Sequence, residues 1–317
     1  MSIHGDIIVR PMRAADLDAA DRIFRLAFGT FLRLPDPMRF AGDSDHVRER
    51  FRASPASAFV AEREGEVVGS NLATRWGTAG FFGPLSVRPD LWGEGVARRL
   101  MEPIVQCFAD WGTTHAALFT FADSAKHVAL YGKFGFHPRF LTAVMGTRVS
   151  PTRAPTPAVL SALSSAERAA CLDEVRALTG TLHEGLDVSI DVDALATNGR
   201  GDTVLVRDDR GALRGLAVCH VGGGSEAGSD ACYVKFGAVP VGPSAADEFD
   251  RLLDACEVFA AARGVQTFLA GTSLAREGAY RRMQARGFRT VIQGVSMHRP
   301  NEPGWSRPEV WAMDDLR

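Results

Sequence analysis

A short run of glycine and alanine between a predicted strand and a predicted helix is the segment of this 317-residue sequence best suited to chemistry. In Leu85–Leu100, LSVRPDLWGEGVARRL, apolar residues lead into a Gly-containing turn and then directly into a helical pattern. The first amides of such a helix have no intrahelical partner and lie at the positive end of its dipole, so they can bind a pyrophosphate. Gly93, Gly95 and Ala97 keep large side chains away from these amides. The sequence therefore predicts a phosphate-binding loop.

Two segments together resemble the GCN5-related N-acetyltransferase (GNAT) family. The family carries Gln/Arg-x-x-Gly-x-Gly/Ala where a helix follows a strand, and this chain has WGEGVA at 92–97, with Trp92 in the place of Gln or Arg. The family also carries a helix of the form Asn-x-x-Ala-x-x-x-Tyr-x-x-x-Gly-Phe. Ser124–Phe136, SAKHVALYGKFGF, is similar to that helix, with Ser124 in the place of Asn.

The resemblance implies that the chain uses acetyl-CoA as a cosubstrate and transfers its acetyl group. Such a transfer needs alignment of the reactants, polarisation of the thioester carbonyl and management of protons. By resemblance, the Val87 amide bonds the thioester carbonyl, and Tyr131 is the acid that protonates the departing thiolate. The residues expected to bind acetyl-CoA are Leu85, Ser86, Val87, Trp92, Gly93, Glu94, Gly95, Val96, Ala97, Arg98, Ser124 and Tyr131.

The general base is not identified by the sequence. Family members often place Glu on the strand before the loop, yet Gly80–Val87, GFFGPLSV, contains no carboxylate. Asp123 is the second expected catalytic residue, and His127 lies close to it, although both types are also common as helix caps and on surfaces. His183 and Glu184 could instead enter a cleft between two halves of the chain, and water could serve in place of a side chain.

Three functions are compatible with these motifs. The leading hypothesis is an acyltransferase, an N-acetyltransferase that moves acetyl from acetyl-CoA directly to a primary amine of a small-molecule or peptide acceptor. The alternative is a non-catalytic acyl-CoA-binding or sensing module. An aminoacyl transferase is a third possibility, but the retained glycine loop at 93–97 argues against it because such enzymes do not need a CoA-type loop. The acceptor and the length of the acyl group are not determined by the sequence.

An internal repeat predicts two tandem copies of one fold. Val60–Gly69 matches Val206–Gly215, and Gly135-Phe136 matches Gly287-Phe288, with shifts near 150 residues. Val149–Pro157, VSPTRAPTP, has the composition of an extended connection, so the expected domains are residues 1–149, which bind acetyl-CoA, and 157–317, a degenerate copy. At a shift of 154, Phe249 falls near Gly95 and is expected to block the second anion site, which leaves the second copy to shape or shield the cleft.

The expected elements make an α/β fold, a mixed sheet with helices on both faces, in two tandem acyl-CoA N-acyltransferase (GNAT) folds. A Gly-rich run, Gly222–Gly228, looks like a phosphate loop, but it connects two predicted strands and therefore predicts a flexible hairpin. The elements expected in the first copy are strand Ile7–Arg10, helix Ala15–Phe28, strands Ala58–Glu62, Glu66–Thr74 and Phe81–Val87, helix Gly95–Trp111, strand Ala116–Phe121, helix Ser124–Phe134 and strand Leu141–Thr147.

The composition is that of a soluble globular protein. With 46% hydrophobic residues, 23% charged residues and a net charge of −2, the chain has no electrostatic preference for nucleic acid or membrane surfaces. No signal peptide or membrane-spanning run is evident, so a cytoplasmic monomer or homodimer is expected. Five cysteines without a CxxC pair indicate reduced thiols, and the scattered histidines predict no metal site.

Overall fold

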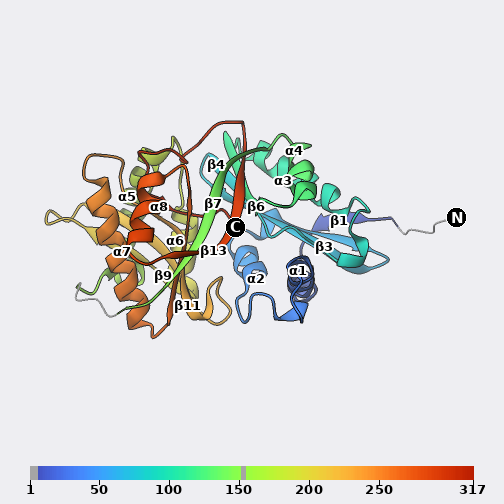
Figure 1. The fold of residues 1–317 in the computed structure, drawn as a ribbon, viewed down its shortest axis with the longest axis horizontal. Helices are drawn as coiled ribbons and strands as arrows, with labels where there is room; N and C mark the ends of the chain where they lie inside the picture. Colours follow the sequence, from blue (N-terminus) through green and yellow to red (C-terminus); the bar gives the residue numbers. More distant parts are fainter. Residues whose placement is uncertain (1–5, 151–154) are drawn as a thin grey trace.

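The computed structural model of this chain describes residues 6–150 and 155–317, so residues 151–154 of the predicted connection lie outside the described residues. Figure 1 shows the two halves of the chain side by side. The helices and strands of the first half are β1 (Ile8–Pro11), α1 (Leu17–Phe31), α2 (His46–Ala53), β2 (Ala58–Arg63), β3 (Glu66–Trp76), β4 (Ala79–Phe82), β5 (Ser86–Val87), α3 (Val96–Asp110), β6 (His115–Phe121), α4 (Ala125–Gly132) and β7 (His137–Arg148). Those of the second half are β8 (Ala158–Val159), α5 (Ser165–Leu182), α6 (Ser189–Asn198), β9 (Gly201–Arg207), β10 (Leu213–Gly222), β11 (Gly228–Ala238), α7 (Ala245–Ala262), β12 (Thr267–Ser273), α8 (Glu277–Ala285), β13 (Arg289–Arg299) and β14 (Ala312–Met313).

The strands of the described ranges form one mixed sheet, of which twelve follow the order β1-β2-β3-β4-β6-β13-β7-β12-β11-β10-β9-β8. Off this path, β5 pairs with β3 and β14 pairs with β11. The order shows that the two halves exchange their last long strands. β13 of the second half pairs with β6, while β7 of the first half pairs with β12, and β7 and β13 are antiparallel neighbours at the centre (Figure 1). Each half therefore completes its sheet with a strand from the other half.

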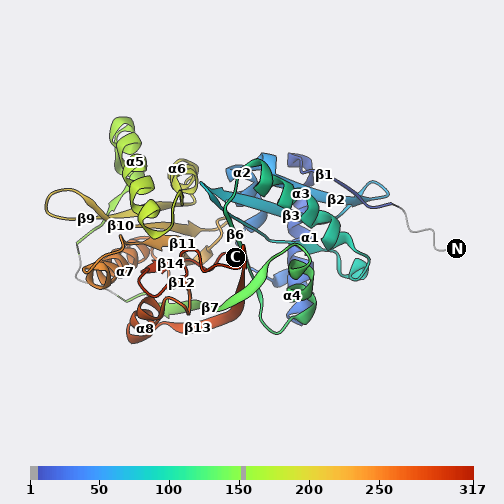
Figure 2. The same cartoon turned by 90° about the horizontal axis from the view of Figure 1, so that it is seen from above.

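Helices cover both faces of this sheet because adjacent strand residues point to opposite sides. Leu72 packs with α1 and α2, whereas its neighbour Ala73 packs with α3. In the second half, Val218 contacts the cluster under α5 and α6, and Ala217 contacts the cluster under α7. Figure 2 shows the strands of the second half between α5–α6 and α7–α8. The described helices include none long and apolar enough to span a bilayer.

The strand predicted at 81–87 is interrupted, and the interruption opens the sheet. β4 pairs in parallel with β6 only as far as Phe81 and Ala117. Beyond that point β5 stays hydrogen-bonded to β3, with Val87 opposite Gly69, and has no pairing with β6. The two neighbouring strands thus diverge at their carboxyl ends, which is where a ligand can enter an open α/β sheet.

The Gly-rich run at 222–228 is the predicted hairpin connection between β10 and β11, but it is held by contacts rather than left free. The Gly224 amide donates to the Asp43 carbonyl at 2.9 Å, and the Asp45 amide donates to the Ser225 carbonyl at 2.8 Å. These bonds attach the connection to the first half and place Glu226 in the interior, with its side chain fully buried.

Candidate active site

The start of α3 has the geometry of an anion site. Gly93 and Gly95 have φ of +92° and +83°, values that favour glycine, and Gly95 is the N-cap without any side-chain capping bond. The first intrahelical bond runs from the Arg99 amide to the Gly95 carbonyl at 3.2 Å, so the amides of residues 96–98 have no acceptor within the helix. A Cβ added at either glycine would meet nothing within 4 Å, so the space beside both glycines is open.

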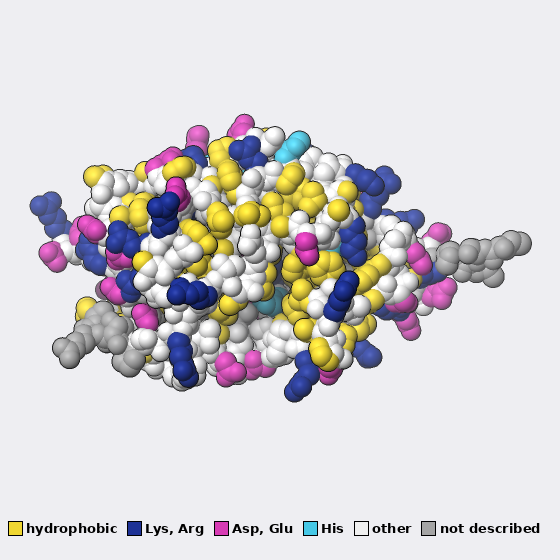
Figure 3. Space-filling model, viewed as in Figure 1, with side chains coloured by type: hydrophobic (Ala, Val, Ile, Leu, Met, Phe, Trp, Pro, Cys, Tyr) yellow, Lys and Arg dark blue, Asp and Glu magenta, His cyan; other side chains and the backbone are white. Residues whose placement is uncertain are grey.

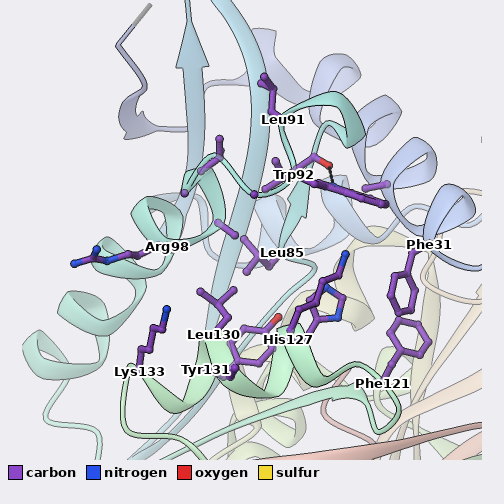
Figure 4. Close-up of a pocket in the computed structure, with 18 of the residues that line it drawn as sticks. Phe31, Leu85, Leu91, Trp92, Arg98, Phe121, His127, Leu130, Tyr131 and Lys133 are labelled. Atoms are coloured by element: carbon purple, nitrogen blue, oxygen red, sulfur yellow. Dashed lines mark hydrogen bonds between the residues drawn. The ribbon is translucent and has the colours of Figure 1, made fainter. Parts of the chain in front are cut away.

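A cavity of about 390 Å³, here called the channel, extends from this turn toward α4. Its walls come from α1, β5, the turn before α3, the start of α3 and one face of α4, as the sticks in Figure 4 show. Arg98 of α3 and Lys133 just after α4 are positively charged lining residues. The lining residues are Ala27, Phe28, Phe31, Leu85, Val87, Leu91, Trp92, Gly93, Gly95, Val96, Ala97, Arg98, Phe121, Lys126, His127, Ala129, Leu130, Tyr131 and Lys133.

The backbone of Val87 faces away from β3 and toward the channel. Arg88 donates to the Val68 carbonyl at 2.9 Å while Val87 lies opposite Gly69. In an antiparallel ladder this register makes Val87 a non-hydrogen-bonded position, so both its amide and its carbonyl point away from β3. The Trp92 indole Nε1 donates to the Val87 carbonyl at 2.8 Å, drawn as the dashed line in Figure 4.

Tyr131 and His127 lie one turn apart on α4 and present their side chains to the same space. Burial raises the pKa of the Tyr131 phenol, so the phenol keeps its proton at neutral pH. Burial, with Lys126 beside it, lowers the pKa of His127 to about 4, so this imidazole is neutral and can accept a proton. The pair therefore offers one donor and one acceptor at the channel wall.

A second cavity of about 140 Å³, here called the aromatic cavity, adjoins the channel. Five residues line both cavities, namely Phe28, Leu85, Phe121, His127 and Tyr131. Figure 3 shows hydrophobic side chains gathered over α1 and the loop after it on the face viewed in Figure 1. The remaining lining residues of the aromatic cavity are Phe24, Leu32, Phe40, His46, Arg50, Phe82, Gly83, Pro84, Phe119, Thr120, Ile292 and Arg317.

Most, but not all, of the residues expected to hold acetyl-CoA lie in the channel wall. Those that line it are Leu85, Val87, Trp92, Gly93, Gly95, Val96, Ala97, Arg98 and Tyr131. Ser86 and Ser124 are buried outside the lining, and Glu94 pairs with Arg63 at 3.0 Å. Asp123 is exposed and lines neither cavity.

His183 and Glu184, the other base candidates, also lie elsewhere. The His183 ring is 5.3 Å from His115 and 5.9 Å from Trp305, and the Glu184 carbonyl accepts a bond from Thr78. Neither residue lines the channel or the aromatic cavity.

Sequence reasoning missed the aromatic side of the site. Phe24, Phe28 and Phe31 follow one another at spacings of four and three on α1, which places their rings on one helix face. That spacing could have indicated an aromatic wall. The role of Arg317 in lining the cavity could not be predicted from the sequence. Its position depends on how the final segment after β13 folds back onto the first half.

The corresponding opening of the second half is filled by the chain itself. β11 pairs with β12 as far as Val234 and Ala270, and then with β14 through Gly237 and Ala238. The Ala312 carbonyl accepts bonds from Thr272 at 3.1 Å and Arg276 at 2.9 Å. Trp311 packs on Phe249 with ring centroids 5.6 Å apart. Residues 311–313 thus occupy the place that the channel takes in the first half.

Phe249 does not stand where the repeat placed it. The helix N-caps Gly95 and Ser244 correspond, so Phe249 in α7 matches Leu100 of α3, and both are fully buried core residues. The expectation that Phe249 blocks the second turn is therefore wrong. The electrostatics of that turn differ instead, because α7 carries Asp247 and Glu248 in its first turn, where carboxylates disfavour a bound anion.

The histidine, cysteine and carboxylate side chains within the described ranges form no group able to hold a metal ion. All five cysteines of the sequence are free thiols. The sulfurs of Cys219 and Cys256 are 4.0 Å apart in the core beneath α7.

The residues of this site lie in a segment that resembles a known protein family. A model of the acetyltransferase (GNAT) family matches residues 21–136, which include the channel turn and α4. A search of curated proteins found no match.

Solved structures resemble the whole chain. A putative acetyltransferase from Pyrococcus horikoshii superposes with a TM-score of 0.69 at 13% identity, over 97% of this chain and 94% of that one. A GCN5-related N-acetyltransferase from Sphaerobacter thermophilus gives 0.57 at 15% identity, over 94% and 96%. A glucosamine N-acetyltransferase region of a fungal multi-domain β-N-acetylglucosaminidase gives 0.62 at 15% identity, over 93% of this chain and 38% of that one. At these identities the likeness shows a shared fold across both halves.

Proposed function

Because a model of the acetyltransferase (GNAT) family matches residues 21–136, we propose that this protein transfers acetyl from acetyl-CoA to a primary amine. The observation that supports the proposal most is the continuity of the channel. It begins at the open amides of residues 96–98 and reaches Tyr131 where β5 and β6 diverge. One cavity thus joins a diphosphate site to a proton donor.

In this proposal the chain holds the cosubstrate mainly through its backbone. The amides of residues 96–98 bind the pyrophosphate, with Arg98 adding charge. The Val87 amide, which points away from β3, donates to the thioester carbonyl and stabilises the oxyanion that develops there. The acetyl group then faces the aromatic cavity through the shared residues Phe28, Leu85 and Phe121.

The proton balance follows from two side chains of α4. A neutral amine attacks the thioester carbon with its lone pair, the C–S bond breaks, and Tyr131 donates its proton to the departing thiolate. The proton that leaves nitrogen restores the phenol, directly or through water. An incoming ammonium group releases its first proton to water, and His127, neutral at physiological pH because its pKa is lowered to about 4, serves as a hydrogen-bond acceptor on that path. In this assignment water takes the place of a carboxylate base.

Replacement of Gly95 with alanine tests the binding part of the proposal. Its positive φ makes alanine strained by about 1–2 kcal/mol, which shifts the turn and its amides. The affinity for acetyl-CoA, measured by isothermal titration calorimetry, should fall about tenfold or more. Gly264→Ala is the matched control, because Gly264 also has a positive φ of +73° and open space around it, but lies beyond α7, far along the chain from the channel.

Both variants should lose similar stability, and only the Gly95 variant should lose affinity. The same titration should give one acetyl-CoA per chain, because residues 311–313 fill the second opening. Equal affinity in the two variants, or two equivalent sites per chain, would contradict the proposal.

A non-catalytic acyl-CoA sensor is a second candidate, and the Trp92–Val87 bond favours it. This bond occupies a backbone carbonyl along which the pantetheine arm would lie, and a sensor needs no base. Release of free thiol, followed with a thiol-reactive dye after mixing acetyl-CoA with amines, separates the two functions. Turnover with any amine excludes the sensor, whereas binding without thiol release for every amine supports it.

A further inference from the structure

We propose that the acceptor is an arylalkyl monoamine, a primary amine on an aromatic body with no second positive charge, and that its ring occupies the aromatic cavity. The inference rests on the proposed acetyl transfer and specifies its substrate class. Three features of the lining support it: the shape of the walls, the sign of the charged side chains, and the engagement of the nearest carboxylates.

The walls of the aromatic cavity are built from phenylalanine rings held by one another. Phe28 and Phe40 are stacked, with centroids 5.4 Å apart and an interplanar angle of 15°. Phe24 meets Phe40 edge-on at 5.3 Å, and Phe82 meets Tyr131 edge-on at 5.6 Å. Fixed ring faces and edges favour a flat aromatic guest over an aliphatic one by about 2- to 10-fold in affinity. The volume of about 140 Å³ is close to that of a dry apolar cavity known to hold one benzene ring.

The charged side chains around both cavities are cationic. Neither the channel nor the aromatic cavity has Asp or Glu among its described lining residues. The charged residues that do line them are Arg50, Arg98, Lys126, Lys133 and Arg317. A polyamine or aminosugar with several ammonium groups would place its remaining charges among like charges, without a counter-ion.

The carboxylates behind the aromatic cavity are already engaged. Glu226 accepts bonds from Arg50 at 3.0 Å and from His46 at 3.3 Å, and lies 3.2 Å from Lys235. Asp315 pairs with Arg317 at 3.1 Å and accepts a bond from the Tyr233 hydroxyl at 2.9 Å. Both carboxylates are buried, so neither can turn toward a guest without giving up its ion pair.

A panel of amines tests the substrate class with the full chain and acetyl-CoA. The probes are 2-phenylethylamine, n-hexylamine and spermidine, and thiol release gives kcat/KM for each. We expect 2-phenylethylamine to exceed n-hexylamine several-fold and spermidine at least 100-fold. Spermidine equal to or better than 2-phenylethylamine would overturn the proposal, and n-hexylamine equal to 2-phenylethylamine would overturn its aromatic part.

A charge variant at the rim gives an independent result. Leu32 lines the aromatic cavity and is 39% exposed, so Leu32→Glu should fold and place a carboxylate at the cavity. This variant should lower kcat/KM for 2-phenylethylamine and raise it for spermidine, each about tenfold. Met38→Glu is the matched control, because Met38 is 40% exposed in the same loop but lines neither cavity, and it should leave the preference unchanged.

Binding without turnover distinguishes failure of this inference from failure of the proposed function. Saturation-transfer NMR should detect 2-phenylethylamine bound in the presence of CoA, and Leu32→Glu should weaken that signal. Transfer to spermidine but not to 2-phenylethylamine overturns the substrate class and leaves acetyl transfer intact. Absence of turnover with all three amines, with 2-phenylethylamine still bound, overturns acetyl transfer and supports the recognition of aromatic amines.

Discussion

Trp92 shows how one residue can change a binding loop without changing its backbone. It stands where similar loops have Gln or Arg, and its indole bonds the Val87 carbonyl at 2.8 Å. The Lys126 ammonium lies 4.3 Å from the centre of the Trp92 ring and 5.5 Å from that of Phe31. Three elements, the turn before α3, α4 and α1, are thereby connected across the channel. A guest that needs the Val87 carbonyl must displace this indole first.

Tyr131 provides a test of chemistry at the residue scale. Tyr131→Phe removes the phenol that we propose as proton donor and keeps the ring that packs edge-on against Phe82. We expect kcat to fall about 100-fold, a size typical of a lost general acid, while the affinity for acetyl-CoA stays within twofold. Steady-state kinetics and calorimetry measure the two quantities.

A conservative change elsewhere controls for the loss of a hydroxyl. Tyr280→Phe in α8 removes a hydroxyl that only accepts a bond from Gln284, and it should leave kcat unchanged. Parallel losses of kcat and of acetyl-CoA affinity in Tyr131→Phe would assign the tyrosine to packing.

The sequence predicted the backbone part of the site better than its side-chain part. The turn could be predicted from Gly93, Gly95 and Ala97. A positive φ at the two glycines and the need for small side chains beside the amides restrict which residue types can stand there. Asp123 was expected to be catalytic because it follows a strand, yet the helix turn that carries His127 and Tyr131 faces the cavities instead. Which face of a short helix meets a cavity depends on packing that no single motif encodes.

At the scale of elements, the connection between β10 and β11 illustrates the same limit. Its glycines predict a turn correctly, but the burial of Glu226 depends on its ion pair with Arg50, which is 176 residues away in the sequence. Burial alone would raise the pKa of the Glu226 carboxyl, but Arg50 and Lys235 hold it well below its usual range. The ionised carboxylate thus joins α2 of the first half to β11 of the second.

Replacement of Glu226 with glutamine tests that connection. The variant keeps the shape of the side chain but removes the carboxylate that pairs with buried Arg50, and it leaves buried Lys235 with Asp191 alone. The free energy of unfolding should therefore fall by about 3–5 kcal/mol. Urea denaturation followed by circular dichroism measures it. Glu94→Gln removes a partly exposed ion pair with Arg63 and should cost less than about 1 kcal/mol. Equal losses would mean that the buried cluster adds nothing specific.

Element types were predicted well and element continuity was not. Helix 96–110 appears as expected, because its apolar spacing survives on both sides of Pro103. The strand expected at 81–87 is divided into β4 and β5. The chain stops pairing with β6 after Phe81, and the apolar sequence of this segment gives no sign of the break. The strand exchange could not be foreseen, because the two copies carry similar final strands and nothing local specifies which sheet each one joins.

At the scale of the whole molecule, a buried histidine cluster lies where the halves meet. His115 Nε2 and His298 Nδ1 are 3.1 Å apart, and the Trp305 ring lies 5.6 Å from His115. Burial is the largest cause that lowers the pKa of His115 to about 3 and that of His298 to about 4. Both rings are therefore neutral in the folded protein at physiological pH.

This cluster predicts a loss of stability in acid. Unfolded histidines bind protons below about pH 6.5 and the folded ones do not, so the stabilisation is complete above pH 6.5 and declines as the pH falls toward 4. Each residue contributes up to roughly 3 kcal/mol of this change. His298→Gln should reduce the difference in unfolding free energy between pH 7 and pH 5, measured in urea, whereas His137→Gln at an exposed position should not. If His298→Gln left the difference in unfolding free energy between pH 7 and pH 5 unchanged, the acid sensitivity could not be assigned to this histidine cluster.

The exchange of β7 and β13 also affects how the protein is made. A ribosome completes β6 about 180 residues before it completes β13, the strand that must lie against it. Translation at ~5–20 residues per second makes that interval roughly 10–35 seconds. During this interval the nascent first half presents a bare sheet edge, which is prone to pair with other chains. Biogenesis of this fold therefore places a demand on ribosome-associated chaperones that two separately closing domains would avoid.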